Sequence, residues 1–165
     1  MNPSPRKILV SGATSGIGAA IAQAFAALGD AVSVTGATEA EVKRAADDPA
    51  FAGITCQALD VRDAAAVAAF VDGLGELDAV VNCAGVIRRG AEHDPAVFAE
   101  VIDINLSGTM RVCSAARAGL KARCGCIVNT ASMLSFFRWR PGAGLQRQQG
   151  RCGAADQEPG HRVRG

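Results

Sequence analysis

The segment KILVSGATSGIGAAIAQAFAAL, residues 7–28, joins a short apolar run to a glycine-rich turn and a helical repeat. The run KILVSG is typical of a buried strand, and apolar residues at three- and four-residue steps from Ile17 to Leu28 predict a helix. Glycines in the turn allow the backbone to approach a phosphate, and the N–H groups that open a helix favour anions. The segment predicts a nucleotide-binding strand–turn–helix unit, with a purely structural turn as the alternative.

Strands and helices alternate through the next hundred residues. Buried strands are predicted at AVSVTG (31–36), ITCQALD (54–60), LDAVVNCAG (77–85) and GCIVNTAS (125–132). Helices are predicted after Thr38, which can cap one, and over about 63–74 and about 95–122. Parallel strands need crossover helices, so this order predicts an α/β fold, a Rossmann-like doubly wound parallel sheet covered on both faces.

Composition and charge narrow the class of protein. The chain is 49% hydrophobic and carries a net charge of +1, which gives no electrostatic reason to expect a nucleic-acid or membrane partner. We see no signal peptide and no apolar run of membrane-spanning length, so we expect a cytoplasmic protein. The six cysteines lack a regular spacing and there are only two histidines, so we expect reduced thiols and no metal site.

Five motifs follow one another along these elements: SGATSGIG (11–18), LDV (59–61), NCAG (82–85), INLSGT (104–109) and NTAS (129–132). In this order they resemble the short-chain dehydrogenase/reductase family, in which TGxxxGxG, an adenine-contacting aspartate, NNAG, a catalytic asparagine and a catalytic serine take these places. The resemblance covers residues 7 to about 137. Ser11 and Cys83 depart from the family pattern.

The resemblance implies a reaction, a cofactor and a set of site residues. The reaction is hydride transfer between NAD or NADP and a secondary alcohol or ketone, with Ser132 and Asn105 as catalytic residues. The implied cofactor-binding residues are Gly12, Thr14, Ser15, Gly16, Ile17, Gly18, Asp60, Val61, Asn82, Ala84 and Gly85. Single positions also have structural alternatives: Asp60 could cap a helix, Asn105 could be a polar helix residue, and Ser132 a loop hydroxyl.

The choice between NAD and NADP rests on the end of the second strand. A carboxylate there binds the ribose 2′-OH of NAD, and a nearby arginine accommodates the 2′-phosphate of NADP. Gly36, Ala37 and Thr38 carry neither group, so both cofactors stay open.

The stretches GVIRRG (85–90) and SMLSFF (132–137) resemble the family branch that acts on sugar acids, such as gluconate 5-dehydrogenase and 2-dehydro-3-deoxygluconate 5-dehydrogenase. Arg88 and Arg89 would then meet a small-molecule carboxylate, with simple solvent exposure as the alternative. The intact family also forms homo-oligomers, which we regard as doubtful for this chain.

Two residues of the family's reaction are missing. Its tyrosine acid/base and the lysine four residues later fall at Leu145 and Gln149, and the chain contains no tyrosine. Leucine has no ionisable proton and glutamine has no charge, so we expect little or no activity.

The tail, residues 138–165, shows no helical or strand period, and we expect it to be irregular. Codons permitted for LQRQQG, read from their second base, encode YSASK, and the continuation reads as an amphipathic helix with tyrosine and lysine in register. We therefore expect a frameshift near Phe137 and Arg138, between an incomplete dinucleotide-binding domain (1–137) and an out-of-frame tail. The fifth strand would then expose apolar surface at a sheet edge. The alternative is a non-enzymatic nucleotide-binding remnant whose arginine-rich tail binds RNA or another acidic partner.

Overall fold

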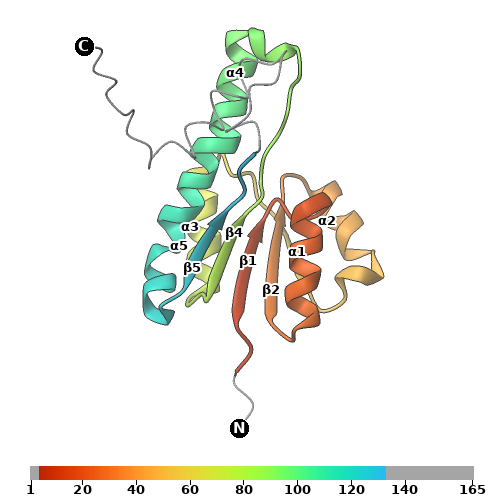
Figure 1. The fold of residues 1–165 in the computed structure, drawn as a ribbon, viewed down its shortest axis with the longest axis vertical. Coiled ribbons are helices and arrows are strands. Elements are labelled where there is room, and N and C mark those ends of the chain that lie inside the picture. Colours follow the sequence, from red (N-terminus) through yellow and green to blue (C-terminus); the bar gives the residue numbers. More distant parts are fainter. Residues whose placement is uncertain (1–3, 133–165) are drawn as a thin grey trace, which may run out of the picture.

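A computed structural model describes residues 4–132. Its centre is a five-stranded parallel sheet in the order β3-β2-β1-β4-β5 (Figure 1). The strands are β1 (Lys7–Ser11), β2 (Ala31–Gly36), β3 (Thr55–Ala58), β4 (Ala79–Asn82) and β5 (Cys126–Asn129). The predicted Rossmann-like doubly wound sheet is confirmed, and the predicted irregular tail lies outside the described residues.

Helices cover both faces of the sheet. They are α1 (Gly16–Ala27), α2 (Glu39–Ala46), α3 (Ala64–Leu74), α4 (Pro95–Ile102) and α5 (Thr109–Arg123), with short 3₁₀ turns η1 (Pro49–Phe51) and η2 (Ala91–His93). Figure 1 shows α1 and α2 on one side of the sheet and α3 and α5 on the other. Successive side chains of β1 therefore enter two cores: Ile8 and Val10 pack on the α1 side, and Leu9 packs on the α3 and α5 side.

The long helix predicted over about 95–122 is not one continuous α-helix. A π-helical segment, η3 (Asp103–Gly108), separates α4 from α5. Within it, the Asn105 side chain bonds the backbone of Val86, and a Cβ at Gly108 would lie 2.6 Å from Cγ2 of Val61. These two contacts occur at the wider π-helical turn. They join residues that are distant in sequence, so the periodicity of apolar residues along one helix does not predict them. Such π segments are frequent at functional sites.

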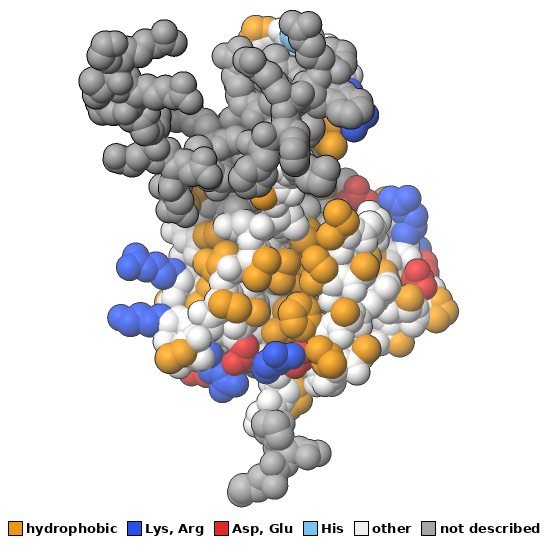
Figure 2. Space-filling model, in the orientation of Figure 1, with side chains coloured by type: hydrophobic (Ala, Val, Ile, Leu, Met, Phe, Trp, Pro, Cys, Tyr) orange, Lys and Arg blue, Asp and Glu red, His pale blue; other side chains and the backbone are white. Residues whose placement is uncertain are grey.

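Strand β5 forms an edge of the described sheet and leaves apolar side chains in solvent. Ile127 is 40% exposed and Val128 is 51% exposed. Val128 is in register with Val81 and so faces the α1 side, where α1 packs on β1 and β2. Figure 2 shows hydrophobic side chains gathered across the middle of the visible face. The exposure of Ile127 and Val128 agrees with the predicted apolar surface at the edge strand.

The described cysteines are free thiols. Burial raises the pKa of the thiols of Cys56, Cys83 and Cys113, which keeps them protonated and poorly nucleophilic. Over residues 4–132, no three metal-ligating side chains are grouped. In the same part of the chain, no helix is both long and apolar enough to cross a bilayer.

Asp78 joins three elements just before β4. Its Oδ2 accepts a hydrogen bond from the backbone N–H of Lys7 at 2.8 Å, and its Oδ1 accepts one from Nε of Arg123 at 3.1 Å. These bonds, the backbone donor first, hold the pKa of the Asp78 carboxyl below its usual value. The stability that the ionised carboxylate contributes is therefore complete above the unfolded pKa of about 4, and it is lost as the pH falls through the lower folded pKa.

We expect Asp78→Asn to lower the free energy of unfolding at pH 7. The difference in this free energy between the variant and the parent chain should narrow at about pH 3. The gap narrows because the parent protonates Asp78 and weakens the same bonds. Urea titrations at the two pH values measure it. Asp47→Asn is the matched control, because its ion pair with Lys43 is solvent-exposed and should contribute little. A gap that does not change with pH would contradict the prediction.

Candidate functional site

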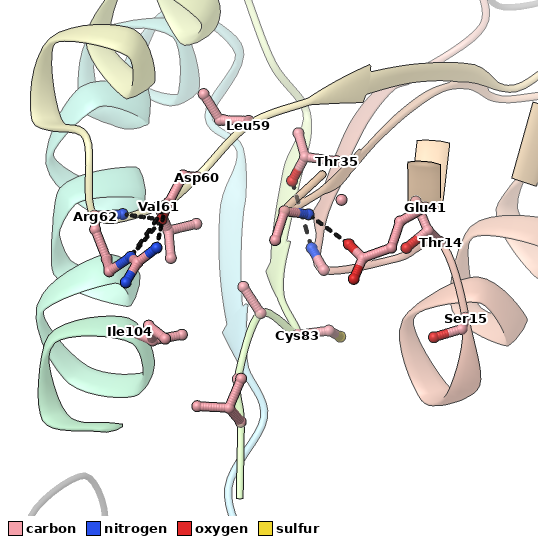
Figure 3. A pocket seen from close by; sticks show the side chains of 16 residues that line it. Thr14, Ser15, Thr35, Glu41, Leu59, Asp60, Val61, Arg62, Cys83 and Ile104 are labelled. Atoms are coloured by element: carbon pink, nitrogen blue, oxygen red, sulfur yellow. Dashed lines mark hydrogen bonds and ion pairs between the residues drawn. The ribbon is translucent and has the colours of Figure 1, made fainter. Parts of the chain in front are cut away.

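A cavity of about 210 Å³ lies where the loops after β1, β2, β3 and β4 meet (Figure 3). This is the crevice at the carboxyl ends of the strands, where open doubly wound sheets bind ligands. Seven of the predicted cofactor-binding residues line it: Gly12, Thr14, Ser15, Asp60, Val61, Ala84 and Gly85. The other four, Gly16, Ile17, Gly18 and Asn82, do not line this cavity.

The glycines of the first loop have different physical roles. Gly12 has φ +64°, and a Cβ there would lie 2.4 Å from Cα of Ala84. A Cβ at Gly18 would lie 2.6 Å from the carbonyl oxygen of Gly12, so both positions are needed for packing of the turn itself. Gly16 has φ +60° and open space around it. The structural reading of the turn thus accounts for Gly12 and Gly18, and Gly16 leaves room beside the loop.

The start of α1 has the chemistry of an anion site. Ser15, the N-cap residue, makes no side-chain capping bond, and the first turn carries no acidic residue. Backbone N–H groups at a helix start have no intrahelical partner, and they carry partial positive charge. Ser15 lines the cavity, so this helix start lies beside it, and a phosphate group there matches its charge and its hydrogen-bond donors.

Asp60 lies on the opposite side of the cavity and is held by Arg62 (Figure 3). Its Oδ2 is 2.6 Å from an Arg62 guanidinium nitrogen, and its Oδ1 accepts the Arg62 backbone N–H at 2.9 Å. The side-chain bond from Arg62 lowers the pKa of the Asp60 carboxyl, so the group is ionised. The helix-cap alternative for Asp60 is wrong, because Asp63 caps α3 through the N–H groups of Ala65 and Ala66.

Asn82 is buried, at 2% exposure, and connects three strands at the floor of the site. Its Oδ1 accepts from Ser11 Oγ at 3.3 Å, and its Nδ2 donates to Oδ1 of Asn129 at 2.8 Å. Its carbonyl oxygen accepts from Thr130 N at 3.1 Å. Asn82 thereby links the glycine-rich loop to the segment that leads into Ser132, which indicates a positioning role.

The two predicted catalytic residues stand apart from the cavity lining. Asn105 Oδ1 accepts from Val86 N at 2.7 Å, its Nδ2 donates to Val86 O at 2.9 Å, and its own carbonyl accepts from Thr109 Oγ1 at 2.9 Å. Ser132 is half-buried beyond β5 and is the last described residue. Leu145 and Gln149 lie outside the described residues. The catalytic assignments therefore stay predictions.

The two arginines predicted to meet a substrate do not line the cavity either. Arg88 is paired with Glu100 on α4, with 3.5 Å between the charged atoms. Arg89 is exposed in the same loop. Their predicted role stays open.

Glu41 lines the cavity and was not among the residues that the sequence identified. Thr38 caps α2, as predicted, and forms a capping box in which the Glu41 side chain returns to the backbone at the end of β2. The spacing Thr-x-x-Glu was the available signal, because a capping box places the glutamate beside the N-cap residue.

Comparison with known proteins identifies the family of this chain. Residues 6–143 match the profile of the family described as short chain dehydrogenase. D-threitol dehydrogenase of Mycolicibacterium smegmatis is 39% identical over 136 residues, which cover 75% of this chain and 51% of that protein. For 2-keto-3-deoxy-L-fuconate dehydrogenase of Xanthomonas campestris, the identity is 34% over 140 residues, covering 82% and 46%.

Among solved structures, F189W actinorhodin polyketide ketoreductase with NADPH superimposes with a TM-score of 0.80 at 28% identity, covering 88% of this chain and 60% of that one. The chain spans about half the length of the curated relatives it matches. The family match supports a nicotinamide dinucleotide as the cofactor class. From the motif order, the sheet and this match, the chain belongs to the short-chain dehydrogenase family.

Proposed function

We propose that the cavity binds the adenosine-diphosphate part of NAD or NADP, in an oxidoreductase unit that serves hydride transfer between nicotinamide and a secondary alcohol or ketone. One observation carries the proposal: a single cavity collects the glycine-rich loop, the Asp60–Arg62 pair and the Ala84–Gly85 turn from separate strands. The family resemblance places the glycine-rich loop, the aspartate and the NNAG turn at the cofactor, and here each of the three follows a different strand.

Different residues of the chain bind different parts of the cofactor. The open space at Gly16 and the N–H groups that begin α1 hold phosphate. Asp60 and Val61 bind the adenine at the far side. Asn82 keeps the loops after β1 and β4 in place. When bound, the dinucleotide supplies or accepts the hydride.

Ser132 would hydrogen-bond the substrate oxygen, and Asn105 would hold a proton-relay water. The bonds of Asn105 to Val86 add a positioning task, since they fix the loop that follows β4. The likeness to 2-keto-3-deoxy-L-fuconate dehydrogenase favours a sugar-acid substrate, with Arg88 and Arg89 as candidate carboxylate ligands. The likeness to D-threitol dehydrogenase favours a polyol, which has no carboxylate.

Binding of NADH to the 165-residue chain tests the cofactor site. We expect weak, saturable binding that ADP-ribose displaces, because the groups of the cavity recognise the adenosine and phosphate end. Fluorescence of bound NADH measures both. Absence of binding at millimolar NADH, with the chain shown to be folded by circular dichroism, would contradict the proposed function.

We further propose that this chain has little or no dehydrogenase activity and that its sequence runs out of frame from about residue 138. The support is the pair Leu145 and Gln149 at the family's tyrosine and lysine positions, and the YSASK that appears one base away. The family match also ends at residue 143, close to the proposed shift. The RNA-binding alternative concerns the tail, and no described residue favours it. The cytoplasm is the proposed location, because we see no signal peptide or membrane-spanning run in the sequence.

The nucleotide sequence across codons 134 to 150 tests the frameshift. A tyrosine and lysine codon in register in the neighbouring frame is expected. Family-unlike coding in both neighbouring frames would contradict it.

A further inference from the structure

We propose that Glu41 makes this site select NAD over NADP, by holding a carboxylate where the ribose 2′ position meets the end of β2. The inference rests on the proposed dinucleotide site and adds a specificity-determining residue to it. A carboxylate at this place accepts a hydrogen bond from a ribose 2′-OH and repels a 2′-phosphate.

The carboxylate of Glu41 is fixed by the backbone it returns to. Its Oε2 accepts from Ala37 N at 2.8 Å and from Thr38 N at 3.3 Å, and Glu41 N donates to Thr38 Oγ1 at 3.2 Å. Figure 3 shows this side chain beside Thr14, across the cavity from Asp60 and Arg62. Moving the carboxylate away would break the capping box at the start of α2, so the charge is pre-organised.

The strand end itself cannot supply an acid at Gly36. A Cβ there would lie 2.6 Å from Cγ2 of Thr14, so a side chain at this position would have to displace Thr14. Ala37 carries only a methyl group. The negative charge at the end of β2 therefore comes from the first turn of α2, four residues after Ala37.

The Glu41 carboxylate bonds backbone N–H groups at this point. Over residues 4–132, no ion pair involves Glu41, whereas Asp60 is neutralised by Arg62. Two basic residues, Lys43 and Arg44, follow Glu41 on α2. Arg44 lines a neighbouring hollow that Glu41 also lines, but it does not line the main cavity, and its Nε donates to Ala40 O at 3.3 Å. A 2′-phosphate at this cavity wall would meet Glu41 before Arg44.

Dissociation constants for NADH and NADPH, measured by fluorescence on the full chain and its variants, test the inference. We expect the parent chain to bind NADH at least about tenfold more tightly than NADPH. Glu41→Gln keeps an oxygen acceptor for the capping bonds and loses the charge, so it should reduce that ratio about tenfold, chiefly through tighter NADPH binding. Glu39→Gln removes an exposed charge from the same helix turn, outside the cavity, and should leave the ratio within about twofold.

A second measurement needs no variant. In the parent chain, raising the salt concentration should bring the dissociation constants of NADH and NADPH closer together. Salt screens the repulsion between the Glu41 carboxylate and a 2′-phosphate. Competition by 2′,5′-ADP against 5′-AMP locates the effect at the 2′ position.

The outcomes separate the two claims. Binding of both dinucleotides with a ratio that neither Glu41→Gln nor salt changes overturns the role of Glu41 and leaves the dinucleotide site standing. A parent chain that prefers NADPH also overturns it. Binding of neither dinucleotide to the folded chain overturns the proposed function and this inference together.

Discussion

The 165-residue chain should catalyse no hydride transfer above background, whereas the chain translated from the restored reading frame should reduce or oxidise its substrate. The missing tyrosine alone should cost about 10²–10⁴-fold, the usual contribution of a general acid or base. The missing lysine should add to this, because a nearby ammonium group lowers the pKa of a tyrosine. Ser132 and Asn105 are present in both chains, so the difference isolates the segment after Phe137.

The absorbance change of NADH or NADPH with a panel of polyols and keto sugar acids measures this difference. The control is the restored chain with its YSASK tyrosine replaced by phenylalanine, which should fall to a rate near that of the 165-residue chain. Turnover by the 165-residue chain at a rate close to that of the restored chain would contradict the prediction.

Gly12→Ala should cost about 2 to 5 kcal/mol of folding stability and abolish dinucleotide binding. Two effects add: a left-handed backbone costs a non-glycine residue about 1–2 kcal/mol, and overpacking costs about 1–3 kcal/mol. The contact is severe because the new Cβ would lie 2.4 Å from Cα and 2.5 Å from N of Ala84. These are backbone atoms at the end of β4, so no side-chain rotation relieves the clash.

Gly16→Ala separates the two effects. Gly16 has nearly the same φ, +60°, but no atom within 4 Å of a Cβ. It should therefore lose only about 1–2 kcal/mol. Urea unfolding followed by circular dichroism measures both variants. Equal losses of unfolding free energy in the two variants would show that the close packing of Gly12 on Ala84 adds nothing to the cost of the substitution.

Periodicity and motif order predicted the five strands and their parallel sheet because each strand is a short apolar run bounded by turn residues. The same reasoning failed inside the predicted long helix. Asn105 and Gly108 make contacts with Val86 and Val61, which are distant in sequence, and a helical period carries no trace of them.

Helix capping explains why two acidic side chains have roles that the sequence did not identify. The helix-cap alternative for Asp60 failed because Asp63 is the residue adjacent to the first turn of α3. Glu41 was missed because the carboxylate was sought on the strand end, while the capping box returns it from the helix. In both cases a side chain bonds backbone groups a few residues from its own position.

Hydrogen–deuterium exchange of the full chain, with and without NADH, tests the dinucleotide site most directly. Our account predicts slower exchange in the segments that build the cavity, residues 11–18, 35–41, 59–62 and 82–86. It predicts no change in residues 109–123 of α5. Unchanged exchange in the cavity segments at saturating NADH, or protection confined to α5, would contradict it.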